Sequence, residues 1–308
     1  METNLRQSFR VLALGRPRAH IAELNGVSIA SLGAAFQMFN AAFLSGPVAA
    51  REDLEARLDS ACRAFAARGL PWAFWICEDW LERPARRALL AACESFGMRA
   101  VAEMPGMVAD TLREPQGRRP APGLEIRLAE DARAMEDFRA VGSVCFHVPP
   151  QWFREIFDDT TPSRDFTCWV AYRDSRPVAT AATFVSGGAI GVYNVATMPD
   201  QRGRGYADAV TRHAIAEASR KSGAARVVLQ STAQGERLYR RLGFREVSRV
   251  IVFNSAPARR SDGAYDQGNA SSRHPSVSLP PPRTARLGGK LRRRAELFVA
   301  LYRGKNAR

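Results

Sequence analysis

The chain has 308 residues, 46% of them hydrophobic, which is enough for two domains of ordinary size with packed cores. No apolar run reaches the roughly 20 residues that a membrane-spanning helix needs, and the N-terminus lacks the apolar core of a signal peptide. The net charge is +14, but residues 256–308 hold 12 Lys+Arg and 3 Asp+Glu, so most of the excess lies in this tail. We therefore expect a cytoplasmic protein with a folded body and a basic tail.

Residues 1–112, rich in Ala, Leu and Arg, are predicted to form an α/β lobe. Apolar residues recur at spacings of three and four over residues 51–68, which indicates a helix, and a similar pattern predicts a helix over residues 27–44. The elements expected next are a buried strand at 72–77, a helix at 84–97, and extended structure to residue 112 that is broken at Pro105-Gly106.

Residues 113–123 contain three prolines and two glycines and are predicted to be a linker. The second region, 124–254, alternates strand and helix patterns. Strands are expected at 124–129, 166–173, 177–186, 189–198, 225–231 and 244–253. Helices are expected at 130–146, 150–157, from about 205 to 222, and at 235–243. These patterns predict an α+β fold.

Residues 255–308 have too few hydrophobic residues to offset the entropy of ordering, so we predict a largely disordered basic tail. Its last segment has the pattern of a short amphipathic helix through Leu291, Ala295, Phe298 and Tyr302. The arginines at 292–294 are the residues that would contact nucleic-acid phosphates or anionic lipid. No nucleic-acid-binding fold accompanies them, and we expect neither a nucleic-acid nor a membrane partner.

The five cysteines are dispersed, with no CxxC pair and no cluster of histidines. Such a pattern is typical of small buried side chains in a reducing compartment. We therefore expect no metal site and no disulfide.

The most informative segment follows the strand that ends near Met198. A loop at 200–204 leads directly into a helix that begins near Gly205. Free N–H groups at a helix start favour anions, and Gly203 and Gly205 remove side chains that would keep a phosphate away from them. Arg202 and Arg204 add positive charge. By itself this pattern also fits an ordinary turn.

The residues of this loop are similar to the signature (Q/R)-x-x-G-x-(G/A) of the Gcn5-related N-acetyltransferase (GNAT) family. Arg202, Gly205 and Ala207 occupy the matching positions. A second family element is matched by GERLYRRLGF, in which Tyr239 precedes Gly243 by four residues. The resemblance covers about 130 residues and implies the GNAT fold, a mixed, mostly antiparallel central sheet flanked by helices, here preceded by the smaller α/β lobe.

The resemblance implies that the protein is an N-acetyltransferase with acetyl-coenzyme A as co-substrate and an amine of a small molecule or protein as acceptor. In the family, the loop amides hold the pyrophosphate, the preceding strand pairs with the pantetheine arm, and the tyrosine, here Tyr239, protonates the departing thiolate. The coenzyme-binding residues expected on this basis are Val195, Ala196, Thr197, Arg202, Gly203, Arg204, Gly205, Tyr206, Ala207, Asp208 and Thr232. A non-catalytic module that binds or senses acetyl-coenzyme A is the alternative.

One position departs from the family pattern. Many members have an asparagine seven residues before the tyrosine, where this chain has Thr232. The candidates for contact with the acceptor are Asn194, Phe146 and Trp152, with Trp169 as a further aromatic. Candidate general bases are His147, Glu155, Asp158 and Asp159, whereas His213 is expected to be structural. The acceptor, the base and the oligomeric state are left open by the sequence.

The first lobe resembles a degenerate copy of the second. Phe96-Gly97-Met98 aligns with Leu242-Gly243-Phe244, and this alignment places Cys93 where Tyr239 stands. No GxG loop precedes it. We expect this lobe to pack against the second, to help shape the acceptor site, and to bind no coenzyme of its own; a plain helical extension is the alternative.

Overall fold

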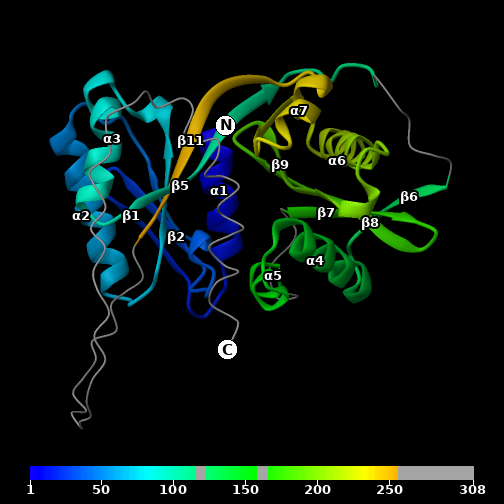
Figure 1. Cartoon of the computed structure of the whole chain (residues 1–308), viewed down its shortest axis with the longest axis horizontal. Helices are drawn as coiled ribbons and strands as arrows, with labels where there is room; N and C mark the ends of the chain where they lie inside the picture. The colour runs from blue at the N-terminus through cyan, green and yellow to red at the C-terminus, as the bar shows by residue number, and fades with distance from the viewer. Residues whose placement is uncertain (116–122, 158–165, 256–308) are drawn as a thin grey trace, which may run out of the picture.

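The computed structural model describes residues 1–115, 123–157 and 166–255 (Figure 1). The predicted tail, most of the linker, and the candidate bases Asp158 and Asp159 lie outside the described residues. The helices are α1 Glu2–Ala13, α2 Arg51–Ala66, α3 Arg83–Ser95, α4 Ala132–Phe146, α5 Pro150–Ile156, α6 Tyr206–Ser222 and α7 Glu236–Leu242. The strands are β1 His20–Leu24, β2 Val27–Ser31, β3 Asn40–Leu44, β4 Ala73–Cys77, β5 Arg99–Ala109, β6 Leu124–Leu128, β7 Phe166–Arg173, β8 Arg176–Ser186, β9 Ala189–Thr197, β10 Arg226–Gln230 and β11 Arg245–Asn254.

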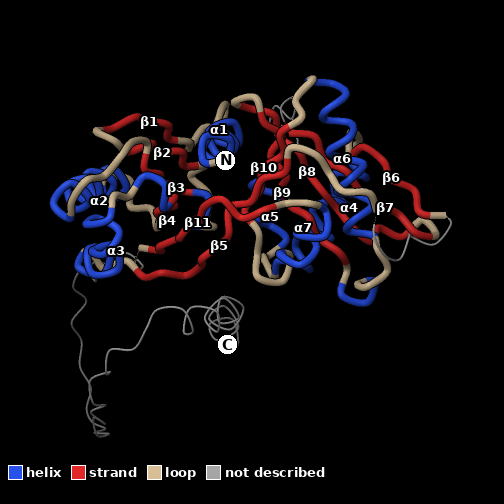
Figure 2. The backbone as a smooth tube through the Cα atoms, turned by 90° about the horizontal axis from the view of Figure 1, so that it is seen from above, coloured by secondary structure: helices blue, strands red, loops and turns tan. Residues whose placement is uncertain are grey.

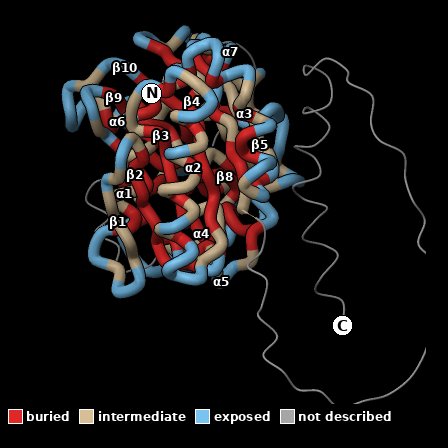
Figure 3. Tube along the Cα trace, turned by 90° about the vertical axis from the view of Figure 1, so that its left-hand side faces the viewer, coloured by how far each residue is buried: buried red, intermediate tan, exposed pale blue. Residues whose placement is uncertain are grey.

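The strands form one 11-stranded sheet in the order β1-β2-β3-β4-β11-β5-β10-β9-β8-β7-β6. Among the described strands, only the β3–β4 and β9–β10 pairs are parallel, so the sheet is mixed and mostly antiparallel, which confirms the predicted fold class. In the second lobe α6 and α7 cover one face and α4 and α5 the other, while α2 and α3 cover the first lobe (Figure 1). The buried residues follow the sheet through both lobes, and exposed segments surround them (Figure 3).

Local sequence signals explain where several helices begin and end. Asp131 caps α4 by accepting a hydrogen bond from the Ala134 N–H at 2.8 Å. A proline lies in the first turn of α3, where its missing N–H costs nothing. Gly223 ends α6 in the left-handed conformation that glycine adopts without strain. These three helices agree with the sequence prediction to within a few residues.

Two predictions for the first lobe were wrong. Residues 27–44 contain the strands β2 and β3, not a helix, and every residue of both strands is buried. A strand covered on both faces is mostly apolar and does not alternate, so the spacing of its apolar residues also satisfies a helical pattern. The expected break at Pro105-Gly106 is absent, because β5 continues through both residues and pairs with β11 there. Helix α1, which was not predicted, lies between the two lobes (Figure 1 and Figure 2).

The lobes are joined by exchanged strands. β5, the last strand of the first lobe, lies between β10 and β11, and β11, the last strand of the second lobe, lies between β5 and β4. Each lobe therefore contributes a strand to the sheet of the other.

The paired strands are related by a local twofold pattern. Met104 pairs with Val250, and these residues are 146 positions apart (250 minus 104). If 146 is added to the β5 residue of a pair and subtracted from its β11 partner, the result is another pair of the same ladder. The pair Glu103–Ile251, for example, is converted in this way into the pair Pro105–Arg249. Even the two irregularities agree, since the extra residue is Val101 in β5 and Val247 in β11. This register supports the interpretation that the first lobe is a copy of the second.

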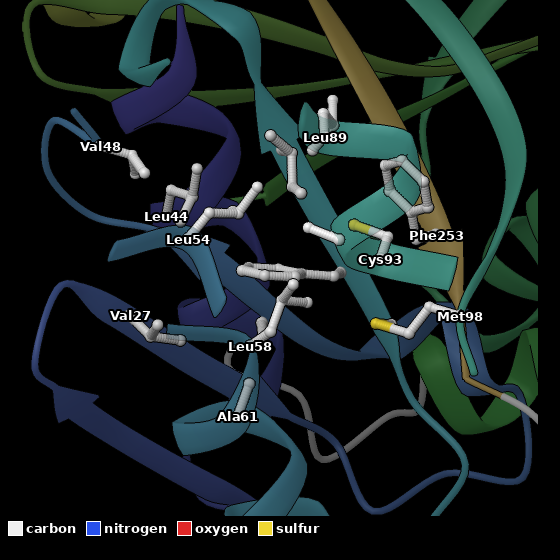
Figure 4. Close-up of a cluster of buried hydrophobic side chains, with 14 of the residues drawn as sticks. Val27, Leu44, Val48, Leu54, Leu58, Ala61, Leu89, Cys93, Met98 and Phe253 are labelled. Carbon is white, nitrogen blue, oxygen red and sulfur yellow. The ribbon is translucent and has the colours of Figure 1, made fainter. Parts of the chain in front are cut away.

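Phe253 shows what the exchange means for packing. It belongs to β11, yet it is fully buried in the core of the first lobe. Figure 4 shows its ring close to Cys93 of α3, with Met98 from the start of the following segment nearby. The core of the first lobe is thus completed by the last described strand of the chain.

None of the described helices is both long enough and apolar enough to cross a membrane.

Candidate functional site

The loop between β9 and α6 has the geometry of an anion cradle. A short 3-10 turn at Pro199–Gln201 leads to two glycines with left-handed backbone, Gly203 at φ 76° and Gly205 at φ 82°, and α6 begins at the next residue. The N–H groups in the first turn of a helix have no intrahelical acceptor, and the helix dipole makes this end positive. Arg202, Gly203 and Arg204 are exposed, so the loop is open to solvent.

Next to this loop, β9 has an unpaired edge. The parallel pairing of β9 with β10 covers only three residue pairs, from Ala189 with Arg226 to Gly191 with Val228. β9 continues as a strand to Thr197, and on that side none of the described residues pairs with it. Because an extended ligand can pair with such an edge through main-chain hydrogen bonds, residues 192–197 can accept a linear, amide-containing molecule.

A bulge at Asn194 shapes this edge. Asn194 has a left-handed backbone, at φ 49°, and the register between β8 and β9 shifts by one residue here. The Thr180 hydroxyl donates a hydrogen bond to the Asn194 carbonyl at 3.0 Å, which holds the bulge. Asparagine takes this conformation more readily than most residues. The bulge alters the direction of β9 where the strand leaves β10.

Tyr239 lies under the point where the two strands separate. Its ring is buried in a cluster with Ile190 and Val192 of β9 and Leu229 of β10. Gly235 makes room for the ring, because a methyl group there would come within 3.1 Å of the ring carbon Cε2. Burial raises the pKa of the Tyr239 hydroxyl above its ordinary value of 10. Within the described part of the chain, this hydroxyl makes no hydrogen bond.

Thr232 supports the entry into α7. Its hydroxyl accepts a hydrogen bond from the Gly235 N–H at 3.2 Å, while the Ser231 hydroxyl donates to the Thr232 carbonyl at 2.8 Å. Thr232 itself is exposed. Its hydroxyl therefore retains a free donor that can reach a ligand, although its first role is to hold the turn.

In the first turn of α6, side chains and main chain have different surroundings. The Tyr206 side chain is 3% exposed and packs in a core cluster with Trp169, so only its main chain can face the cradle. Ala207 is half-buried. Asp208 binds Arg212 at 2.8 Å, and Arg212 in turn donates to the Arg113 carbonyl at 2.7 Å. The Asp208 carboxylate is therefore engaged within the protein.

Cys145, which was not predicted to be a site residue, lies at this loop. Its thiol contacts the Arg202 guanidinium and the Thr197 main chain, and burial raises the pKa of the thiol while Arg202 acts in the opposite direction. Arg202 also donates a hydrogen bond to the Thr197 carbonyl at 3.3 Å. The end of α4 thus borders the cradle. Cys145 and Arg202 are far apart in the chain, so no local sequence pattern could have predicted their contact.

The sequence of the second lobe matches a known family over its central part. Residues 164–246 match the acetyltransferase (GNAT) domain family. This chain contains a GNAT domain. The match includes β9 with its unpaired edge, the cradle loop, α6, β10, and α7 with Tyr239. A comparison with curated proteins gave no match.

Solved structures share the fold over most of the chain. A GCN5-related N-acetyltransferase from Kribbella flavida has a TM-score of 0.64 at 18% identity, over 84% of this chain and 96% of its own. A conserved protein of unknown function from Staphylococcus epidermidis has 0.56 at 10% identity, over 77% and 94%. A GCN5-related N-acetyltransferase from Sphaerobacter thermophilus has 0.52 at 15% identity, over 75% and 76%. The likeness extends beyond the GNAT domain into the first lobe, and it concerns the fold.

The first lobe contacts the GNAT domain on the side of α4 and α5. Trp152 of α5 stacks on Phe36 of the first lobe, with ring centroids 5.2 Å apart. Phe146 is 36% exposed and stacks on Phe153 at 6.3 Å. Trp152 is thus part of the contact between the lobes, whereas Phe146 is accessible at the end of α4.

Of the other predicted bases, Glu155 contacts the first lobe and His147 ends a helix. The Glu155 carboxylate accepts a hydrogen bond from the Ala35 N–H of the first lobe at 3.2 Å. His147 ends α4 with a left-handed backbone at φ 54°. His213 and Trp169 pack edge to face, with ring centroids 4.4 Å apart. Because His213 belongs to α6, this pair lies on the opposite face of the sheet from Trp152.

Helix α1 also takes part in shaping the GNAT domain. Asn4 is 2% exposed, and its amide donates to the carbonyls of Phe184, Ser186 and Ala189. Its oxygen accepts a hydrogen bond from the Tyr193 hydroxyl at 2.6 Å. A side chain at Gly191 would collide with this amide, so glycine is required there. Asn4 therefore fixes the β8–β9 hairpin directly before the Asn194 bulge.

The first lobe has no equivalent of the open edge. Its parallel strands β3 and β4 are held together beyond their ends by a bridge between Val48 and Leu81. Val48 is fully buried and exchanges main-chain hydrogen bonds with Trp80 and Glu82 at 2.7 and 3.0 Å. The segment before α2 fills the place that is open beside β9.

Among the described residues, no group of His, Cys, Asp or Glu could hold a metal ion.

The backbone of Gly203 allows a direct test of the cradle. We expect Gly203→Ala to weaken coenzyme A binding. The backbone of Gly203 is left-handed, and a residue with a Cβ atom adopts this conformation at a cost of about 1 to 2 kcal/mol. No atom lies within 4 Å of the added methyl group, so steric clash plays no part. Gly203→Asn should retain more affinity, because asparagine tolerates this backbone. Isothermal titration calorimetry would measure the affinity of both variants for coenzyme A. If both variants bound as tightly as the wild-type protein, the proposed role of the loop backbone would be contradicted.

Proposed function

We propose that this protein transfers an acetyl group from acetyl-coenzyme A to an amine of a small molecule or protein. The observation that supports this most is the direct continuation of the solvent-open cradle into the unpaired edge of β9. A diphosphate with a linear, amide-containing arm matches this pair of features, and coenzyme A has both groups. The GNAT domain match favours the same ligand.

The proposed reaction is a direct transfer. The neutral amine attacks the thioester carbonyl carbon, the carbon–sulfur bond breaks, and the electron pair leaves on sulfur. A main-chain N–H near Val195, on the edge that β10 leaves free, stabilises the developing negative charge on the carbonyl oxygen. Tyr239 then donates its proton to the thiolate, the acetylated nitrogen loses its extra proton to solvent, and Tyr239 is reprotonated from solvent. The ordinary pKa of a tyrosine, about 10, already keeps the Tyr239 hydroxyl protonated at neutral pH, as an acid must be, and burial raises this pKa further.

The test is a thiol-release assay with acetyl-coenzyme A and a panel of amines, with products identified by mass spectrometry. Turnover with any amine, dependent on Tyr239, supports the enzyme. Binding of coenzyme A without turnover over a broad panel would favour a sensing module. If the protein failed to bind coenzyme A at millimolar concentration, both functions would be excluded.

We expect one coenzyme A per chain. The GNAT domain has the open edge, whereas the Val48–Leu81 bridge closes the corresponding place in the first lobe. Isothermal titration should therefore give a stoichiometry of one, and Gly203→Ala should weaken that single transition. A second transition that Gly203→Ala leaves intact would show that the first lobe binds coenzyme as well.

A further inference from the structure

A second basic feature lies beside the proposed coenzyme site. A groove of about 420 Å³ on the flank of α7 is lined by four arginines together with Ala233 and Glu236. The arginines are Arg113, Arg237, Arg240 and Arg241. Glu236 is paired with Arg240 at 2.7 Å, which leaves three of the four arginines without a counterion.

These three arginines are exposed and uncompensated. Within the part of the chain that the structure describes, the guanidinium groups of Arg113, Arg237 and Arg241 make no ion pair or hydrogen bond. Three like charges around one groove repel each other, and an anion bound between them would remove this repulsion. Arginine is well suited to phosphate because its planar donor fork can bind two oxygens.

The groove is linked to the cradle through two side chains. Asp208 in the first turn of α6 binds Arg212, and Arg212 donates to the carbonyl of Arg113, which lines the groove. Arg113 is itself fixed, because its N–H donates to the Leu242 carbonyl at 2.9 Å. The arginine groove and the start of α6 are therefore neighbouring parts of one face, where α6 and α7 lie close together (Figure 1).

The first lobe provides an internal comparison. Under the shift of 146 positions that relates β5 to β11, the counterparts of Arg237, Arg240 and Arg241 are Ala91, Glu94 and Ser95. The lobe with the closed strand gap thus lacks the arginines. The arginines are thus present in the lobe that has the open cradle and absent from the lobe that lacks it. This difference indicates that the arginines serve the ligand of the cradle and are not required by the fold.

We propose that this groove binds the 3′-phosphate of coenzyme A, so that Arg237 and Arg241, with Arg113, determine the preference for the phosphorylated coenzyme. The inference rests on the proposed function. With the diphosphate at the start of α6 and the pantetheine arm along β9, the adenosine end points away from β9. Its 3′-phosphate is a dianion near neutral pH, and the three uncompensated arginines of the groove supply the complementary charge.

The test compares coenzyme A with 3′-dephospho-coenzyme A by isothermal titration at low salt. The wild-type protein should bind coenzyme A about tenfold more tightly, in line with charge-assisted contacts at an exposed site. In Arg237→Gln/Arg241→Gln the preference should disappear while the affinity for the dephosphorylated ligand stays unchanged, which also shows that the variant is folded. Arg87→Gln, an exposed residue of α3, is the matched control and should retain the preference.

The outcomes separate the two proposals. Equal affinity of the wild-type protein for both ligands would overturn the groove assignment and leave the coenzyme site intact. A preference that persists in the double variant would overturn it as well. If neither ligand bound, the proposed function itself would fail, and the groove assignment with it.

Discussion

Replacement of Tyr239 by phenylalanine should lower kcat by about 100-fold or more, the usual contribution of a positioned general acid, with little change in the affinity for acetyl-coenzyme A. The ring stays in its cluster, and the lost hydroxyl makes no hydrogen bond within the described residues, so stability should be unchanged. Steady-state kinetics, calorimetry and thermal unfolding on the same preparation test these three expectations.

Tyr172 offers a matched control. Its hydroxyl donates to the Asp137 carboxylate at 2.9 Å, on the α4 side of the sheet. Tyr172→Phe should therefore lose about 1 to 2 kcal/mol of stability and keep its kcat, the reverse of Tyr239→Phe. An unchanged kcat in Tyr239→Phe would show that Tyr239 is only a core residue, and another group or water would have to protonate the thiolate.

The pH dependence of the same residue has a defined sign. Burial raises the pKa of Tyr239 in the folded state, so the folded protein holds this proton more tightly than the unfolded chain does. The associated stability is fully present below the unfolded pKa of about 10 and is lost as the pH rises above it. The rate should accordingly show no decline from ionisation of Tyr239 below pH about 10.

A fragment of residues 123–255, which contains the complete GNAT domain match, should not fold or bind coenzyme A on its own. The reason is that β5, which lies between β10 and β11, comes from the first lobe. Its removal leaves β10 without a partner on one side and β11 without any partner, because β4, the other neighbour of β11, also belongs to the first lobe. It also deprives the cluster around Tyr239 of Met107 and Ala109, which are 0% and 3% exposed. Unpaired main-chain groups in the middle of a sheet are costly. Circular dichroism and calorimetry provide the measurement.

Co-expression with residues 1–115 is the control. If the exchange explains the failure, the two fragments should assemble, unfold cooperatively and bind coenzyme A together. Phe253→Ala in the whole chain should cost about 3 to 5 kcal/mol, since it empties a buried site, whereas Val247→Ala at an exposed position should be nearly neutral. Cooperative folding of residues 123–255 alone would contradict this account of the sheet.

Features that depend on residues close together in the chain could be predicted from the sequence, whereas features that depend on tertiary contacts could not. The cradle depends on two glycines with left-handed backbone and the helix that follows, all within a few residues. Helix α2 and strand β4 likewise have patterns that their own sequences specify. By contrast, Tyr206 and Asp208 fit the coenzyme motif, yet the tertiary structure directs one into the core and the other to Arg212.

The sequence by itself determined the fold class, the elements of the second lobe and the loop that defines the proposed coenzyme site, because periodicity, glycines and helix ends act over short distances. Only the tertiary structure decided that residues 27–44 form buried strands, that Asn4 holds the β8–β9 hairpin, and that β5 and β11 are exchanged. These features depend on contacts between residues far apart in the chain. Hydrophobic patterning shows that a segment is buried, but not which partner buries it.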